Sequence, residues 1–97
     1  MGGMKRLFLA IAVALLTAIA ATAEKTLDVY WVDVEGGGAT LIVTPAGQSI
    51  LIDTGNPGTR DAGRIHEVAT KLAKLKKIDF LITTHFHGDH FGGAATL

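Results

Sequence analysis

The chain has 97 residues, no cysteine, and nine basic residues that balance nine acidic ones. The absence of cysteine excludes a disulfide-stapled miniprotein, and a hydrophobic content of 48% excludes a disordered tail. Seventeen of the hydrophobic residues precede Glu24, so the rest of the chain has an ordinary globular composition. The sequence therefore predicts one small folded region behind an apolar N-terminal segment.

This N-terminal segment has the pattern of an export signal. Two cations, Lys5 and Arg6, precede the apolar run 7–21, and the small-x-small pattern that signal peptidase reads follows. We therefore predict a signal peptide over residues 1–23 and an exported mature chain, periplasmic or extracellular, over residues 24–97. A retained membrane anchor is the alternative, but the run is short for a span and rich in alanine. Cleavage of the signal would leave no stable membrane span.

The charge balance bears on the kind of partner. Loss of the signal would leave seven basic residues against nine acidic ones, which creates no strong field for nucleic acid or anionic lipid. Four lysines gather near the end of a predicted helix, where cations complement the helix dipole. They are Lys71, Lys74, Lys76 and Lys77. A nucleic-acid partner stays open but has no support from charge, and a small-molecule or ester-type substrate is favoured.

Three strands are predicted in the first half of the mature chain. Residues rich in valine, isoleucine and aromatic side chains predict strands over 27–34, 39–44 and 49–53. The three glycines at 36–38 are interpreted as a flexible hairpin turn. Tyr30 and Trp31 are expected in the core rather than in a substrate site, because aromatic side chains bury a large area.

A helix and a fourth strand follow. The helix is predicted over 61–76 with Asp61 as its N-cap, and the strand over 78–84. One apolar stripe marks the buried side of the helix: Ile65, Val68, Ala69, Leu72 and Leu75. A meander of strands followed by a helix and a strand favours an α/β (α+β) fold, with a mixed β-sheet and helices on one face.

A cluster of metal-ligand residue types follows the last predicted strand. Residues 84–93 (THFHGDHFGG) contain three of the four histidines and an aspartate, and such side chains suit Zn²⁺, Mn²⁺ or Fe²⁺. At the end of an extended strand, His85 and His87 are two residues apart and can reach one ion. The next glycine lets the chain turn, which brings Asp89 and His90 toward a second position. We predict a metal site, with a capped turn and incidental histidines as the alternative.

This cluster resembles the signature of a known family. Residues 85–90 (HFHGDH) match the H-x-H-x-D-H signature of the metallo-β-lactamase fold superfamily, and residues 53–55 match its upstream D-T-G element. The run 32–55 looks like the competence-type, ComEC-like branch, although the acidic residue of that branch is absent after Glu35. The resemblance covers residues 27–93. It implies an αββα sandwich of which this chain would form the N-terminal part.

The resemblance also implies a role for each residue of the motif. His85 and His87 would hold a first divalent metal ion. Asp89 and His90 would hold a second, with zinc expected and manganese or iron as alternatives. A hydroxide held by the two ions would attack the substrate, and Asp89 would orient the attacking water or accept its proton. Asp53 would lie beside the site as a supporting or structural residue, with a simple turn as the equal alternative.

The function implied in this way is an exported metal-dependent hydrolase of an ester, phosphoester or amide-type bond. The alternatives are a metal-binding protein without catalysis and an inactive relative that only makes interactions. In the family, the remaining metal ligands come from loops well after this motif. Residues 24–97 are therefore expected to be an incomplete N-terminal portion of the domain, and the 97-residue chain alone is expected to be inactive.

Overall fold

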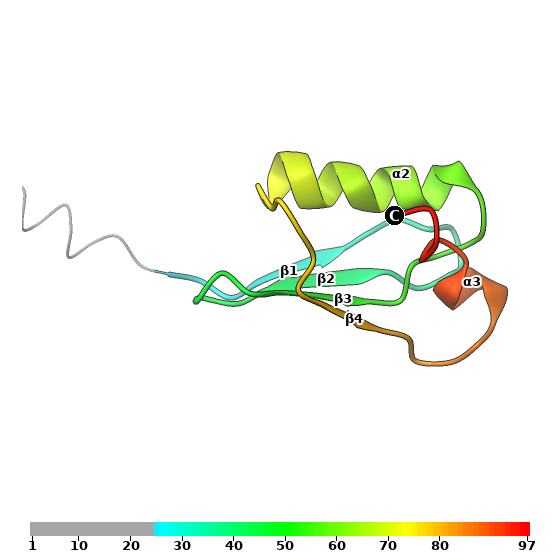
Figure 1. Ribbon diagram of the computed structural model, residues 1–97, viewed down its shortest axis with the longest axis horizontal. Helices are drawn as coiled ribbons and strands as arrows, with labels where there is room; N and C mark the ends of the chain where they lie inside the picture. Colours follow the sequence, from blue (N-terminus) through cyan, green and yellow to red (C-terminus); the bar gives the residue numbers. More distant parts are fainter. Residues whose placement is uncertain (1–24) are drawn as a thin grey trace, which may run out of the picture.

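The computed structural model describes residues 25–97, which form a four-stranded sheet with a helix along one face (Figure 1). The strands are β1 (Asp28–Trp31), β2 (Thr40–Val43), β3 (Ser49–Ile52) and β4 (Phe80–Ile82), and they lie in the sheet in chain order. The pairs β1–β2 and β2–β3 are antiparallel, whereas β3 and β4 are parallel. The mixed α/β fold with a helix on one face is thereby confirmed.

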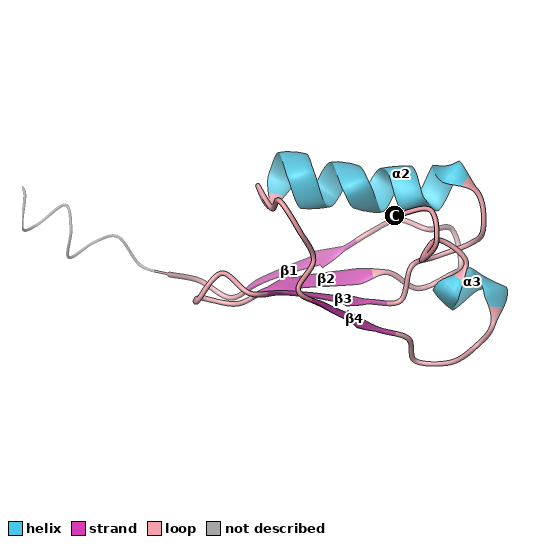
Figure 2. Cartoon of the chain, viewed as in Figure 1, coloured by secondary structure: helices cyan, strands magenta, loops and turns pink. Residues whose placement is uncertain are grey.

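The helical segments follow from this topology, because two parallel neighbours need a crossover connection. The crossover consists of α2 (Thr59–Glu67) and the π-helix η1 (Val68–Leu72), which follows it directly. The short helix α3 (Gly88–Phe91) lies beyond β4 at one end of the sheet (Figure 2). None of the helices within the described range is long and apolar enough to cross a membrane. The predicted signal peptide, residues 1–23, lies outside the described residues.

The core lies between the sheet and α2 because apolar side chains alternate along the central strands. Leu41 of β2 and Leu51 of β3 are paired in register, both are almost fully buried, and Ile65 of α2 belongs to the same cluster. Their neighbours Ile42 and Ile50 point to the opposite face and are only partly buried. The described sheet is therefore packed on one side.

The outer strand β4 is much less covered than β2 and β3. Its side chains Phe80, Leu81 and Ile82 are 53%, 49% and 48% exposed. Within residues 25–97 it pairs with β3 on one side and with no strand on the other. Its apolar composition is thus not matched by burial in the described part of the chain.

The helix departs from the predicted span in a way that changes its buried side. The prediction was one regular helix over 61–76, but the chain changes from α-helix to π-helix at residue 68. A π-helix has more residues per turn, so the regular spacing of the stripe is lost. Ile65 and Ala69 are buried, whereas Leu72 is 64% exposed. The prediction that Leu72 belongs to the core is wrong for this reason.

The two aromatic residues of β1 differ in burial. Tyr30 packs against the core, but Trp31 is 81% exposed, so the prediction of a buried Trp31 is wrong. Successive residues of a strand point to opposite faces, and α2 covers only one face of the described sheet (Figure 1). The alternation of side chains along the strand therefore leaves Trp31 exposed, although a tryptophan can bury a large area.

Asp61 has a larger role than the N-cap that was predicted. The N-cap is Gly58, and Asp61 lies in the first turn of α2 with 1% of its surface exposed. Its Oδ2 accepts hydrogen bonds from the amide N and Nδ2 of Asn56 at 2.8 and 2.9 Å. Nδ2 of Asn56 also donates to the carbonyl of Val34 at 3.1 Å. Asp61 thus ties α2 to the loops after β3 and β1.

The ionised form of Asp61 is strongly favoured. The hydrogen bond from Nε of Arg60, at 2.8 Å, is the main reason that the pKa of Asp61 lies well below its usual range. Burial opposes this shift, and the two hydrogen bonds from Asn56 reinforce it. The buried carboxylate is therefore charged and fully partnered.

Replacement of this carboxylate by an amide is expected to destabilise the fold. Asp61→Asn keeps the shape of the side chain but removes the charge, so the free energy of unfolding should fall by about 2 kcal/mol. Urea denaturation measures this change. The matched control is Glu67→Gln, which breaks an exposed pair with Lys71 and should cost less than about 1 kcal/mol. Equal losses in the two variants would contradict the role given to Asp61.

Acid should remove the same contribution. The pKa of Asp61 is lower in the folded state than in the unfolded chain, so its stabilisation is complete above an unfolded-state value of about 3.9 and is lost as the pH falls toward the folded-state pKa. The difference in unfolding free energy between the parent and Asp61→Asn should therefore shrink from about pH 6 to about pH 3. Urea titrations at both pH values test this, and a constant difference would speak against it.

Candidate metal centre

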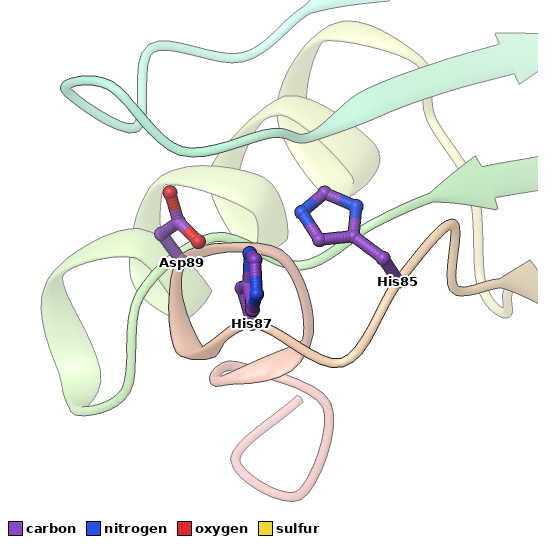
Figure 3. Close-up of side chains that lie close together, drawn as sticks. All are labelled: His85, His87 and Asp89. Atoms are coloured by element: carbon purple, nitrogen blue, oxygen red, sulfur yellow. The ribbon is translucent and has the colours of Figure 1, made fainter.

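Three candidate ligands meet on the segment that joins β4 to α3. The chain after β4 carries His85 and His87, and α3 begins at Gly88, which places Asp89 in its first turn. One ligand atom from each of His85, His87 and Asp89 lies within 4.8 Å of the others. Figure 3 shows the three side chains around one shared space. Residues from a strand end and a helix start are thus brought together.

The chemistry of this group fits a divalent metal ion. Two imidazoles and one carboxylate are ligands that zinc uses in proteins. Two ligands that are each about 2.1 Å from one ion lie at most about 4.2 Å apart, so a group spread over 4.8 Å is slightly open. His85 and His87 are exposed and Asp89 is half-buried, which leaves the group open to solvent. The assignment of these residues as ligands stays a prediction.

His90, the fourth predicted ligand, lies beside the group rather than in it. Its Nδ1 is 2.9 Å from Oδ2 of Asp53, and its ring centroid is 3.9 Å from that of His85. Its Nε2 is 3.7 Å from Oδ2 of Asp89, a separation that two ligands of one ion can have. Asp89 is therefore close to the histidines of both predicted ions.

Asp53 directly follows β3 and is buried next to His90. Its backbone has a φ of 64°, in the left-handed region, and only 4% of its surface is exposed. Oδ1 accepts a hydrogen bond from the amide of Thr84 at 2.8 Å, and Oδ2 accepts one from the Thr84 hydroxyl at 2.7 Å. Together with the contact to His90, these bonds tie Asp53 to the loop after β4.

The hydrogen bonds also decide the charge of Asp53. Burial alone would raise its pKa. The hydrogen bonds from Thr84 and His90 outweigh burial and hold the pKa of Asp53 below its ordinary value. At neutral pH the side chain is therefore a carboxylate that accepts hydrogen bonds and donates none.

The glycine-rich loop between β1 and β2 is a part of the site that sequence reasoning missed. The amide of Gly38 donates to the carbonyl of Asp89 at 3.1 Å. A Cβ at Gly37 would overlap this same carbonyl, and a Cβ at Gly38 would lie 2.7 Å from Nδ1 of His90. The run of three glycines was interpreted as a flexible turn. A run of glycines that is longer than a turn requires is a signal that another segment approaches the backbone closely. This signal could have been used to predict that the loop belongs to the site.

An added methyl group at Gly38 should disturb His90. Gly38→Ala places its Cβ too close to Nδ1 of His90 and 3.2 Å from Oδ2 of Asp53, so it should lower the free energy of unfolding by about 1–3 kcal/mol. The matched control is Gly63→Ala, at an exposed position of α2 with no atom within 4 Å of the new Cβ. This control should be neutral or stabilising. Thermal or urea denaturation that ranks the two variants equally would refute the close packing.

The chain is similar in sequence to bacterial proteins that are named metal-dependent hydrolases. The chain is 41% identical over 73 residues to a UPF0173 metal-dependent hydrolase of Cupriavidus metallidurans, which is 72% of this chain and 22% of the relative. It is 37% identical over 84 residues to another of Polynucleobacter asymbioticus, which is 84% of this chain and 27% of that relative.

A mammalian protein is also similar. Metallo-beta-lactamase domain-containing protein 1 of Rattus norvegicus is 36% identical over 58 residues, which is 60% of this chain and 23% of the relative. The chain thus spans about a quarter or less of the length of these curated relatives. No solved structure is significantly similar. The model of the Metallo-beta-lactamase superfamily matches residues 32–97, and the chain therefore belongs to this superfamily.

Proposed function

We propose that this chain supplies the H-x-H-x-D-H metal site of an exported, divalent-metal-dependent hydrolase that cleaves an ester, phosphoester or amide-type bond. The observation that carries the proposal is the convergence of His85, His87 and Asp89 within 4.8 Å. Membership of the superfamily and the similarity to proteins named metal-dependent hydrolases support it.

The site is proposed to hold two ions, with zinc as the expected metal. His85 and His87 would bind one ion, and Asp89 and His90 would bind the other. The support is that Nε2 of His90 and Oδ2 of Asp89 lie 3.7 Å apart, while the carboxylate of Asp89 also lies within reach of the first two histidines. Imidazole and carboxylate ligands also accept manganese or iron, so elemental analysis decides the metal.

The chemistry divides between the metal and the protein. A bound divalent ion lowers the pKa of water toward about 7 and polarises the oxygen of the scissile group. Asp89, which is half-buried beside His85, His87 and His90, is proposed to orient the attacking water or to accept its proton. The exposure of His85 and His87 leaves the site accessible to a small-molecule substrate.

Substrate and location rest on the sequence. The likeness to the competence-type branch stays a prediction, and we do not extend it to a nucleic-acid substrate because the chain carries no excess of basic residues. Export is proposed from the pattern of residues 1–23 alone. A fractionation experiment that finds the protein in the cytoplasm with its N-terminus intact would contradict export without affecting the metal site.

Loss of one ligand should remove the metal. The full-length protein is expected to retain a divalent transition metal after dialysis, and His87→Ala should lose the greater part of it, because one of the two histidines proposed for the first ion is missing. The control is His66→Ala, an exposed residue of α2 outside the group, which should retain metal as the parent does. Elemental analysis of the dialysed proteins measures the content.

Hydrolysis of a generic ester or phosphodiester, with and without a chelator, then separates the interpretations. Chelator-sensitive turnover that disappears in His87→Ala supports the enzyme. Metal retention without turnover on any of these bonds favours a metal-binding protein without catalysis. A purified parent protein that carries no metal would overturn the proposal and favour a relative that only makes interactions.

A further inference from the structure

The hydroxyl group of Thr84 lies between the buried carboxylate of Asp53 and the exposed ring of His85. Oγ1 of Thr84 is 2.7 Å from Oδ2 of Asp53 and 3.0 Å from Nδ1 of His85. Both separations are hydrogen-bond distances. The hydroxyl therefore links the end of β3 to the first residue of the metal-binding motif.

The direction of each hydrogen bond follows from the donors available. An ionised carboxylate only accepts hydrogen bonds, so the Thr84 hydroxyl uses its single proton to donate a hydrogen bond to Asp53. The oxygen of Thr84 then has lone pairs but no second proton, so its bond with His85 requires a proton on Nδ1 of the ring. The nitrogen left without a proton in His85 is Nε2.

His90 reaches the same state by a direct contact. Its Nδ1 lies 2.9 Å from Oδ2 of Asp53, and this oxygen can only accept, so Nδ1 of His90 also carries the proton. One carboxylate oxygen thus orients His90 directly and His85 through the hydroxyl of Thr84. The centroids of the two rings lie 3.9 Å apart, and the ring planes are inclined at 47° to one another. The two histidines that Asp53 orients are therefore also in contact with each other.

We propose that Thr84 is a positioning residue that passes the hydrogen bond of Asp53 to His85 and holds both His85 and His90 as Nδ1–H tautomers with Nε2 free for a metal ion. The inference rests on the proposed function only in treating the two histidines as ligands. The tautomers themselves are a property of the metal-free chain. A ligand imidazole whose other nitrogen is hydrogen-bonded is fixed in orientation and is the more basic ligand.

Thr84 also contacts Asp53 through its backbone. This second contact makes it possible to distinguish a role of the hydroxyl in orienting His85 from a purely structural role of the residue. The Thr84 amide donates to Oδ1 of Asp53 at 2.8 Å, which holds the loop whatever the side chain is. Thr84→Val keeps this amide and the shape of the side chain but lacks the hydroxyl, whereas Thr84→Ser restores it. A purely structural role of the residue predicts no change of tautomer in either variant.

The experiment is nitrogen NMR of the full chain labelled with ¹⁵N at histidine, free of metal, at a pH at which imidazoles are neutral. His85 and His90 are assigned from the signals lost in His85→Gln and His90→Gln. In the parent, both should show a protonated Nδ1 and an unprotonated Nε2. In Thr84→Val, His85 should become a mixture of tautomers while His90 stays unchanged, and Thr84→Ser should restore the parent state of His85.

The control variant is Thr83→Val, the preceding residue, whose hydroxyl takes part in none of the side-chain hydrogen bonds found among residues 25–97. It should leave both tautomers unchanged. A zinc titration against a chromogenic chelator provides the second measurement. Thr84→Val should weaken zinc binding about 10-fold, with Thr84→Ser and Thr83→Val close to the parent.

An Nε2–H tautomer of His85 in the parent would overturn the inference, and so would a pure Nδ1–H tautomer in Thr84→Val. Either result leaves the proposed hydrolase intact. Conversely, a parent with the expected tautomers that retains no metal would contradict the proposed function but not the role of Thr84 in orienting the ring. The two failures are therefore distinguishable.

Discussion

The carboxylate of Asp53 is the contact on which the rest of the site depends. It is buried at the end of β3, and it accepts hydrogen bonds from the backbone and side chain of Thr84 and from His90. A buried carboxylate without partners would be costly, so these partners have to be in place when the chain is folded. The amide of Asp53 also donates to the carbonyl of Ile82 at 2.8 Å, which extends the pairing of β3 with β4 up to the metal-binding motif.

A set of backbone contacts holds the same region from the other side. The amide of Thr54 donates to the carbonyl of His90 at 2.7 Å, and that of Gly55 donates to the carbonyl of Gly38 at 2.9 Å. The amide of Gly92 donates to the carbonyl of Gly55 at 3.0 Å. Loops after β1, β3 and β4 are therefore joined through main-chain atoms, which side-chain variation leaves intact. Supports of this kind keep ligand groups in place before a metal arrives.

The sequence was sufficient for much of this arrangement. Alternating apolar residues predicted the strands within a few residues, and the mixed sheet followed from their order. The spacing of residues 85–90 predicted two neighbouring pairs of candidate ligands, His85 with His87 and Asp89 with His90. In the structure His85, His87 and Asp89 form one group, and His90 lies beside it. These features are local, since each depends on the period of a strand or on residues a few positions apart.

What the sequence could not predict depends on contacts between distant segments. Leu72 has the right spacing for a buried helix position, but the change to a π-helix turns it to solvent. Asp61 is a residue type that is common at N-caps, but it lies in the first turn of α2, where it accepts hydrogen bonds from Arg60 and from Asn56 of the preceding loop. The place of Thr84 between Asp53 and His85 likewise requires β3 and β4 to be neighbours, which no short pattern specifies.

The exposed strand β4 has a consequence for the behaviour of the chain in solution. In the described sheet its outer edge has free backbone donors and acceptors, and its three side chains are apolar and about half exposed. A strand edge with these two properties is a template for pairing with a strand of another molecule. Any form of the protein in which this edge is uncovered is therefore prone to aggregate, and the charged lysines that commonly protect such edges are absent from Phe80–Ile82. The strand that precedes the predicted metal ligands is thus also a strand that is open to self-association.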